Sequence, residues 1–298
     1  MSNKLHKDTF VAVITLLLLV FAGILLGMGA LQLYLHQTGK DITLLTEGLQ
    51  NAQDMAARNF FRLLAAGNHL MIFIIPGLVF FKLYPRKTTF SSYQDDPQLK
   101  YKLLTFGVLL IVLSMPLIQF FHVINKAIPL PDFLVQLEHQ TNDAIKGMLR
   151  MNNPKEFIFN LTVIALLPAI GEELVFRGGL QRMLHRDFNP HLAILISAFI
   201  FSAIHLQFEG FLPRMVLGAL LGYFYYWSGR LWVPILMHFV NNAVQILAVY
   251  LMQDQLVEMN VSDEIDFPWP FTMMSALLSF FLIQQCIRLI RPNPTPVE

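Results

Sequence analysis

Two adjacent carboxylates and an arginine interrupt an apolar part of this chain. Glu172, Glu173 and Arg177 follow the run 157–170, which is almost free of polar groups. Ionisable residues inside a membrane are rare and usually mark function. Glu173 and Arg177 are four residues apart, so on a helix they can pair and partly neutralise each other. Glu172 points about 100° away from Glu173 and has no partner close in sequence, which makes it the candidate for chemistry.

Three more polar side chains lie inside apolar stretches further along the chain, namely His205, His238 and Asn242. His238 and Asn242 are four residues apart and share one face of a helix. Glu172 and His205 lie at nearly equal distances along the chain from a predicted turn near 188–189. In an antiparallel helical hairpin these two side chains therefore meet at one level, and the same rise per residue brings His238 to a similar depth. The pattern predicts one site built from three helices.

This set of side chains suits hydrolysis of a bond by an activated water molecule. We expect Glu172 to take a proton from water while His205 helps to hold that water. His238 and Asn242 can then donate hydrogen bonds to the oxyanion on the scissile carbonyl group. Glu173 and Arg177 are expected to support the site as a structural ion pair, and Phe201 to pack beside His205.

A metal ion is an open alternative in the same place. Glu172, His205 and His238 can supply the two histidines and one carboxylate of a catalytic zinc site. The chain contains no His-Glu-x-x-His helix, and its single cysteine, Cys286, excludes a cysteine-based zinc site and an internal disulfide bond. The sequence is compatible with both a metal-free glutamate mechanism and a zinc mechanism.

The composition indicates a membrane protein. Of the 298 residues, 55% are hydrophobic and only 14% are charged, whereas soluble domains carry about 25% charged residues. The net charge of +1 gives no reason to expect a nucleic-acid partner. We predict an all-α bundle with spans near the length that a bilayer requires. The predicted spans are 10–35, 66–84, 103–124, 156–180, 190–207, 211–228, 232–252 and 271–290.

The segments between the spans indicate how the bundle is oriented. An even number of spans places both termini on the same side of the membrane. Lysine and arginine residues are concentrated on that side, and acidic residues such as Asp254 and Glu258 on the other side. By the positive-inside rule, both termini are cytoplasmic. Apolar residues in 41–65 and 132–150 recur at three- and four-residue steps, which predicts amphipathic helices on the outer face. No repeat or linker divides the chain, so 1–298 is predicted to be a single membrane domain.

Three motifs in this order resemble the signature of the CPBP family. This family comprises membrane-embedded CAAX-processing proteases and bacteriocin-processing or immunity proteins, also called the Abi family. The motifs are Glu172-Glu173-x-x-Phe176-Arg177-Gly178, Phe201-x-x-x-His205 and His238-x-x-x-Asn242. The resemblance covers 155–245, which we predict to be the catalytic core. It implies a protease and the site roles given above.

The resemblance and the composition together predict an integral membrane endopeptidase of a prokaryotic inner or plasma membrane. It would cleave a membrane-associated protein or peptide near the cytoplasmic side of the bilayer. Eukaryotic relatives imply cleavage beside a lipidated cysteine, whereas bacteriocin maturation, self-immunity and turnover of membrane proteins are the prokaryotic alternatives. The rival class is a non-catalytic immunity factor, scaffold or transporter that uses the same polar cluster for binding. The sequence predicts no oligomeric state.

Overall fold

Every regular element that the structure describes is a helix. The computed structural model describes residues 7–50, 54–85, 97–252 and 268–290, and the predicted all-α class is confirmed there. The elements in chain order are α1 (Lys7–Thr38), α2 (Ile42–Gln50), α3 (Met55–His69), η1 (Leu70–Ile74), α4 (Ile75–Leu83), α5 (Pro97–Leu113), α6 (Met115–Lys126), α7 (Asp132–Leu149), α8 (Pro154–Asn160), η2 (Leu161–Leu166), α9 (Leu167–Glu173), η3 (Leu174–Gln181), α10 (Arg182–Leu184), α11 (Pro190–Ala203), α12 (Phe211–Ser228), α13 (Trp232–Leu251) and α15 (Trp269–Ile290).

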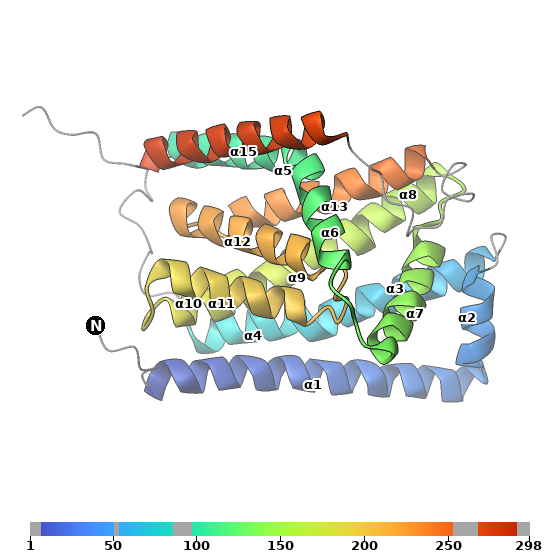
Figure 1. Cartoon of the computed structure of the whole chain (residues 1–298). Coiled ribbons are helices and arrows are strands. Elements are labelled where there is room, and N and C mark those ends of the chain that lie inside the picture. The colour runs from blue at the N-terminus through green and yellow to red at the C-terminus, as the bar shows by residue number, and fades with distance from the viewer. Residues whose placement is uncertain (1–6, 51–53, 86–96, 253–267, 291–298) are drawn as a thin grey trace, which may run out of the picture.

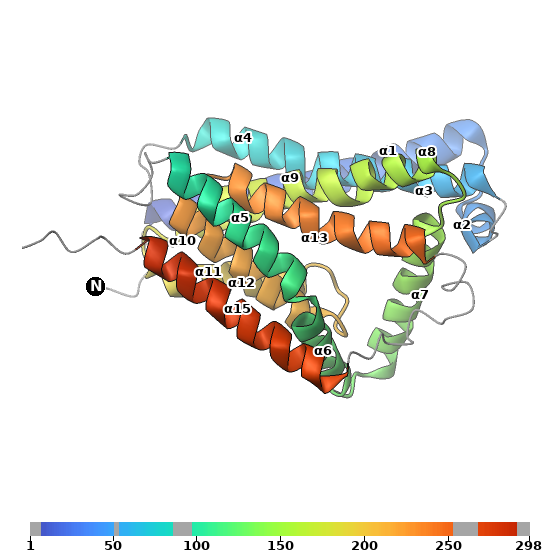
Figure 2. The same cartoon turned by 90° about the horizontal axis from the view of Figure 1, so that it is seen from above.

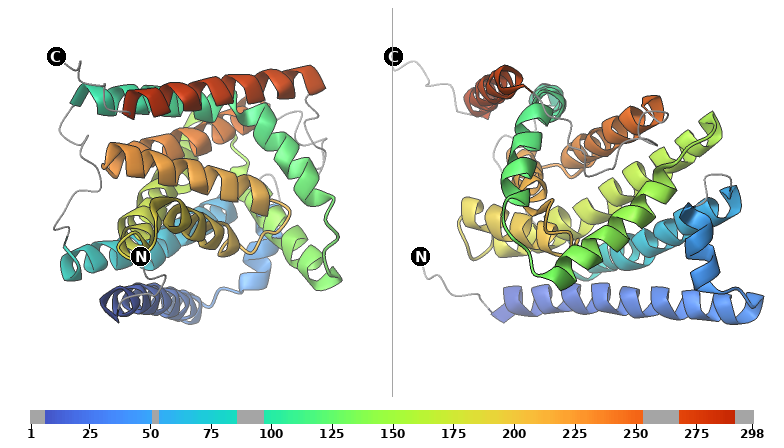
Figure 3. Two further views of the ribbon diagram at one scale, coloured as in Figure 1. Left: turned by 60° about the vertical axis from the view of Figure 1, so that its left-hand side comes forward. Right: turned by 45° about the vertical axis from the view of Figure 1, so that its right-hand side comes forward.

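The bundle places α1 and α15 on opposite faces (Figure 1). α1 packs against η1 and α4, and α15 packs against α5 and α6. Between these faces lie α9, α11, α12 and α13. The predicted site residues lie on α9, η3, α11, the turn after α11, and α13. Figure 2 shows α7 across one end of the bundle, away from the end where α1 begins. The two views of Figure 3 show the same separation of α1 from α15.

Two long helices contain wider π-helical turns. One runs from Met55 to Leu83 through η1, and the other from Pro154 to Leu184 through η2 and η3. Proline lacks a backbone N–H and its ring clashes with the carbonyl group four residues earlier. Pro76 and Pro168 are the second residues beyond η1 and η2, and a π-helical turn before each proline changes the local register so that the helix can continue. Such turns occur frequently at functional sites.

The number of membrane spans stays a prediction. Five helices are long and apolar enough to cross a bilayer, and the bent pair α5–α6 makes a sixth candidate. α11 is apolar but has only 14 residues. Lys7 at the start of α1 and Ile290 at the end of α15 lie at the same end of the bundle (Figure 1). Parts of the charge pattern behind the predicted orientation, including Asp254 and Glu258, lie outside the described residues.

The structure divides two of the predicted segments. The segment 41–65 is not one surface helix, because residues 55–65 belong to the continuous helix that ends at Leu83, and only α2 is separate. The predicted span 103–124 consists of two helices, α5 and α6, bent by 52°. The second predicted amphipathic segment, 132–150, does form a helix, α7.

The bend between α5 and α6 has an identifiable cause. Pro116 stands in the first turn of α6, where a proline removes one backbone donor. The Ser275 hydroxyl of α15 donates to Leu113 O at 2.6 Å and accepts from Leu117 N at 3.3 Å. The side chain of another helix is therefore inserted where one helical hydrogen bond is missing, which is a common origin of a kink.

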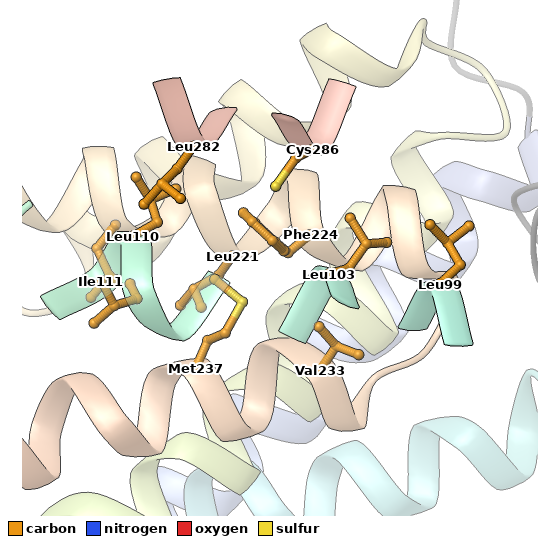
Figure 4. Close-up of a cluster of buried hydrophobic side chains, with 11 residues drawn as sticks. Leu99, Leu103, Leu110, Ile111, Leu221, Phe224, Val233, Met237, Leu282 and Cys286 are labelled. Carbon is orange, nitrogen blue, oxygen red and sulfur yellow. The ribbon is translucent and has the colours of Figure 1, made fainter. Parts of the chain in front are cut away.

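A buried apolar cluster joins α5, α12, α13 and α15 (Figure 4). Met237 of α13 lies in this cluster with no exposed surface, beside Phe224 of α12. Cys286 of α15 belongs to it as well and is a free thiol. Since Met237 precedes His238, packing of this cluster fixes the helix that carries one of the predicted site residues.

A buried ionic cluster ties α3 to α8. Arg58 Nε and Nη2 donate to the two oxygens of Glu156 at 3.1 and 3.2 Å. Arg62 Nη1 donates to Glu156 Oε2 at 2.7 Å, and the other Arg62 nitrogens donate to the backbone carbonyls of Met148 and Arg150. Asn153 caps this helix, because its side chain accepts from the backbone N–H groups of the first turn of α8. We call Arg58, Arg62 and Glu156 the α3–α8 cluster.

Candidate active site

The predicted pair of Glu173 and Arg177 is present and buried. Arg177 Nη1 donates to Glu173 Oε1 at 2.7 Å, and the two side chains are 1% and 0% exposed. Arg177 Nη2 donates to the backbone carbonyl of Gly218 on α12 at 2.8 Å. A Cβ atom at Gly218 would lie 3.2 Å from Ala198 Cα of α11, so glycine permits this close packing. The arginine thus joins the end of α9 to α12.

His238 lies between the two adjacent glutamates. Its Nδ1 is 2.9 Å from Glu173 Oε1, and its Nε2 is 3.8 Å from Glu172 Oε2. All three side chains are buried. The first distance is a hydrogen bond, whereas the second is too long for one. Two polar groups at such a separation can be bridged by a water molecule. Sequence spacing predicted Glu173 only as the partner of Arg177, so its contact with His238 was missed.

Phe201 forms an aromatic wall beside these charges. Its ring lies edge-on to the rings of His205 and His238, with centroids 5.2 and 5.9 Å away. The Arg177 guanidinium lies over the same ring at 4.8 Å, as in a cation–π contact. The predicted packing of Phe201 against His205 is therefore present, and Phe201 also contacts two members of the ionic group.

His205 does not lie within a helix, contrary to the prediction. α11 ends at Ala203, and His205 belongs to the turn that follows. The next residue, Leu206, has a φ of 53°, which L-residues other than asparagine and aspartate rarely adopt. His205 Nδ1 donates to Phe201 O at 2.8 Å, because a carbonyl oxygen can only accept. The ring is half-buried at the edge of the site.

Side chains from neighbouring helices hold the turn after His205. Asn125 of α6 donates to Phe208 O and accepts from Leu212 N. Glu138 of α7 accepts from Glu209 N at 2.9 Å. The predicted amphipathic helix α7 thus contacts the segment that carries His205.

Asn242 lies one turn beyond His238 on α13 and is half-buried. Its Oδ1 accepts a hydrogen bond from Asn241 Nδ2 at 3.0 Å. The structure therefore brings Glu173, Arg177, His238 and Phe201 into direct contact, with Glu172 3.8 Å from His238 and His205 against Phe201. Asn242 shares the helix with His238 without contacting the glutamates.

Two further basic residues face this region, and neither was predicted. His69 ends α3 and interacts electrostatically with His238 and His205. Arg214 of α12 interacts electrostatically with Glu172 and with Glu138. His69 carries no signal in the sequence, because a histidine near a helix end is ordinary. Only the packing of η1 against α9 brings it to the site.

The side chains predicted as zinc ligands do not form one ligand set in this arrangement. Among the residues that the structure describes, no group of three or more His, Cys, Asp or Glu side chains could hold a metal ion. Glu172 and His238 approach each other to 3.8 Å, whereas His205 lies against Phe201 at the edge of the site. Zinc binding stays a prediction that metal analysis of the purified protein tests.

The helices and the buried site define a class of protein. Apolar helices of bilayer length identify an integral membrane protein, and a glutamate–histidine site buried among them is rare unless it has a function. Residues 154–244 match the family described as "Type II CAAX prenyl endopeptidase Rce1-like". This segment of the chain is therefore similar to that family, and the match agrees with the resemblance predicted from the three motifs.

A curated bacterial protein is similar to part of the chain. The chain is 33% identical over 94 residues to "Uncharacterized protein YpbD" of Bacillus subtilis (strain 168). The match covers 30% of this chain and 46% of YpbD, so the chain spans about half the length of that relative. No solved structure matches the chain.

Proposed function

We propose that this protein is a membrane-embedded endopeptidase that hydrolyses a peptide bond with a water molecule activated by Glu172. One observation carries the proposal: Glu172 Oε2 and His238 Nε2 face each other across 3.8 Å in a buried site. The Rce1-like match of the surrounding segment supports the same reaction class. The predicted cytoplasmic position of the site is part of this proposal.

The pairing of His238 with Glu173 determines which ring nitrogen faces Glu172. Glu173 is ion-paired with Arg177 and, as a carboxylate, it can only accept hydrogen bonds. Nδ1 of His238 therefore carries the proton in the 2.9 Å contact, and Nε2 is directed to Glu172. A carboxylate that holds an imidazole in one orientation and stabilises its protonated form is a recurring part of hydrolytic sites.

Glu172 acts as the general base on water. The hydroxide oxygen adds to the carbonyl carbon of the substrate while the water proton passes to Glu172. Protonated His238 donates from Nε2 to the oxyanion, and Asn242 on the same helix face adds a second donor. Collapse of the tetrahedral intermediate breaks the C–N bond, and Glu172 returns its proton to the leaving nitrogen. The products are a carboxylic acid and an amine.

His205 supports the attacking water from the edge of the site. Because its Nδ1–H is bonded to Phe201 O, the neutral ring presents Nε2 as an acceptor. An acceptor at this position can hold one proton of the water while Glu172 removes the other. Arg177 and Phe201 are positioning residues, since they contact Glu173 and the two histidines.

We propose that the substrate is a membrane-associated protein or peptide. It can be identified as the precursor that accumulates when cleavage is abolished. Wild-type membranes and membranes with Glu172→Ala are compared by quantitative proteomics. An uncleaved precursor that accumulates only with Glu172→Ala would identify both the activity and the substrate. The purified full-length protein is then assayed on that precursor, and the same preparation is analysed for stoichiometric zinc.

Glu173→Ala serves as the companion variant in the cleavage assay. It removes a supporting carboxylate and leaves the proposed base in place, so it should reduce cleavage less than Glu172→Ala does. Full cleavage by a folded Glu172→Ala protein would overturn the proposal.

A further inference from the structure

A third histidine borders the site from a part of the chain outside the Rce1-like match. His69 is the last residue of α3 and directly precedes the π-helical turn η1. It is half-buried, like His205 and Asn242, whereas Glu172 and His238 are buried. We call the half-buried side chains the rim of the site and the buried pair its floor.

The packing of η1 places His69 against this rim. A Cβ atom at Gly171 would lie 2.8 Å from Phe73 Cβ, so η1 touches the residue directly before Glu172. The His69 ring stacks on the Phe73 ring with centroids 5.6 Å apart. His69 also interacts electrostatically with both His238 and His205. Three imidazole rings from three separate parts of the chain thus border one region.

His69 differs from the other two histidines in its hydrogen bonds. Nδ1 of His238 is bonded to Glu173, and Nδ1 of His205 to Phe201 O. Nδ1 of His69 is buried and has no hydrogen-bond partner among the described residues. A buried polar atom without a partner costs about 1–3 kcal/mol, and such atoms are uncommon in folded proteins. A ligand that supplies the missing partner would explain why this atom is tolerated.

We propose that His69 is a substrate-binding residue whose Nδ1 forms a hydrogen bond with the backbone of a peptide bound over Glu172. The inference rests on the proposed peptidase function. An imidazole nitrogen can donate or accept, so it can pair with a backbone N–H or C=O group whatever the substrate side chains are. Its position on the rim, beyond the 3.8 Å gap between Glu172 and His238, suits contact with a residue that flanks the scissile bond.

Two substitutions distinguish the contribution of the His69 Nδ1 atom from that of the aromatic ring. His69→Phe keeps the stacking on Phe73 and removes both nitrogens, whereas His69→Asn keeps a polar atom near the position of Nδ1. His122→Phe is the matched control, because His122 is a half-buried histidine on α6. Thermal unfolding in detergent micelles confirms that each full-length variant is folded.

The probe is an N-acylated tripeptide aldehyde, and its binding is measured with full-length protein carrying Glu172→Gln so that no cleavage occurs. We expect His69→Phe to weaken binding about tenfold, the loss of one hydrogen bond of about 1.4 kcal/mol. His69→Asn should recover most of this loss, and His122→Phe should bind like its parent. On the accumulating precursor, His69→Phe with Glu172 intact should raise KM about tenfold and change kcat less.

The outcomes distinguish this inference from the proposed function. Unchanged probe binding by a folded His69→Phe protein would overturn the inference and leave the role of Glu172 standing. Weakened binding restored by His69→Asn, together with full cleavage by Glu172→Ala, would support His69 and overturn the catalytic proposal. Failure of the parent protein to bind any peptide probe would overturn both.

Discussion

The molecule contains two buried ionic groups that differ in how completely their hydrogen bonds are made. In the α3–α8 cluster, Arg58 and Arg62 surround Glu156, and no side-chain nitrogen or oxygen of the three is a buried atom without a partner. Around Glu172 the pattern is the opposite. Glu173 Oε2 and Arg177 Nε are buried without partners among the described residues, and Glu172 stands 3.8 Å from His238.

This difference separates a structural charge cluster from a site prepared for chemistry. Removing charges from water is costly, and a buried cluster persists only if its remaining donors and acceptors are satisfied. The α3–α8 cluster meets that condition with the Glu156 carboxylate of α8 and backbone oxygens of Met148 in α7 and Arg150 directly after it. The group around Glu172 has hydrogen-bond donors and acceptors without partners, and a bound water or substrate requires such free groups.

The largest effect on activity is expected from Glu172→Gln. The substitution keeps the size of the side chain and removes the base, so cleavage should fall by about 10³-fold. The midpoint of thermal unfolding should change little, because Glu172 has no direct hydrogen bond to lose. A cleavage assay and an unfolding scan on the same preparation measure the two effects. A large loss of stability with activity retained would show that Glu172 has a structural role and not a catalytic one.

The largest effect on stability is expected from Glu156→Ala. The substitution leaves two buried arginines without their carboxylate, which typically costs about 3–5 kcal/mol. Denaturant unfolding in micelles measures this change. Asp143→Ala is the control, because the Asp143–Lys146 pair is exposed and 3.7 Å long, and surface ion pairs contribute little. Equal stability of the two variants would show that the α3–α8 cluster is not structural.

Glu173→Gln tests a residue that is both part of a structural ion pair and part of the proposed catalytic site. The amide oxygen can still accept from Arg177 or His238, but the charge that compensates Arg177 is lost. We expect cleavage to fall about 10–100-fold, which is typical for a residue that orients another group. The free energy of unfolding should fall less than it does for Glu156→Ala. A loss of cleavage as large as that of Glu172→Gln would assign the base role to Glu173 instead.

The smallest effect on stability is expected from relieving backbone strain, which among the described residues is found beside the site. Leu206, beside His205, is the one residue other than glycine with a positive φ among those described. Its side chain is 57% exposed, so Leu206→Gly loses little packing and should raise the free energy of unfolding by up to about 1 kcal/mol. The control Leu195→Gly, inside α11, should lower it by about 1 kcal/mol. A destabilised Leu206→Gly protein would contradict the assignment of strain.

The features that follow from short spacings could be predicted from the sequence. The pair of Glu173 and Arg177 depends only on the rise and rotation of one helix, and so does the helix start at Asn153. The all-α class follows from apolar runs of bilayer length. The limits of α3 and the bend after α5 could not be predicted in the same way, because they depend on π-helical turns and on Ser275 of a distant helix.

The predicted site was incomplete for the same reason. Depth along each helix brought Glu172, His205 and His238 to one region, but depth does not say which atoms meet. The rotation of α13 decides that His238 lies against Glu173 as well as Glu172. The end of α11 at Ala203 moves His205 onto a turn, and the packing of η1 on α9 brings His69 to the rim. Each of these is a tertiary contact that single-helix periodicity does not encode.

The Ser275 hydroxyl has a consequence for how the protein is made. Leu113 O and Leu117 N face each other across the bend, and the group that bonds to both belongs to α15, the last helix described in the chain. During synthesis from the N-terminus, α5 and α6 are complete long before α15 has emerged. A bend formed before α15 is present would leave this donor and acceptor without the Ser275 hydroxyl, which is costly wherever no bulk water can satisfy them. The packing of α15 therefore completes a part of the molecule that was synthesised earlier.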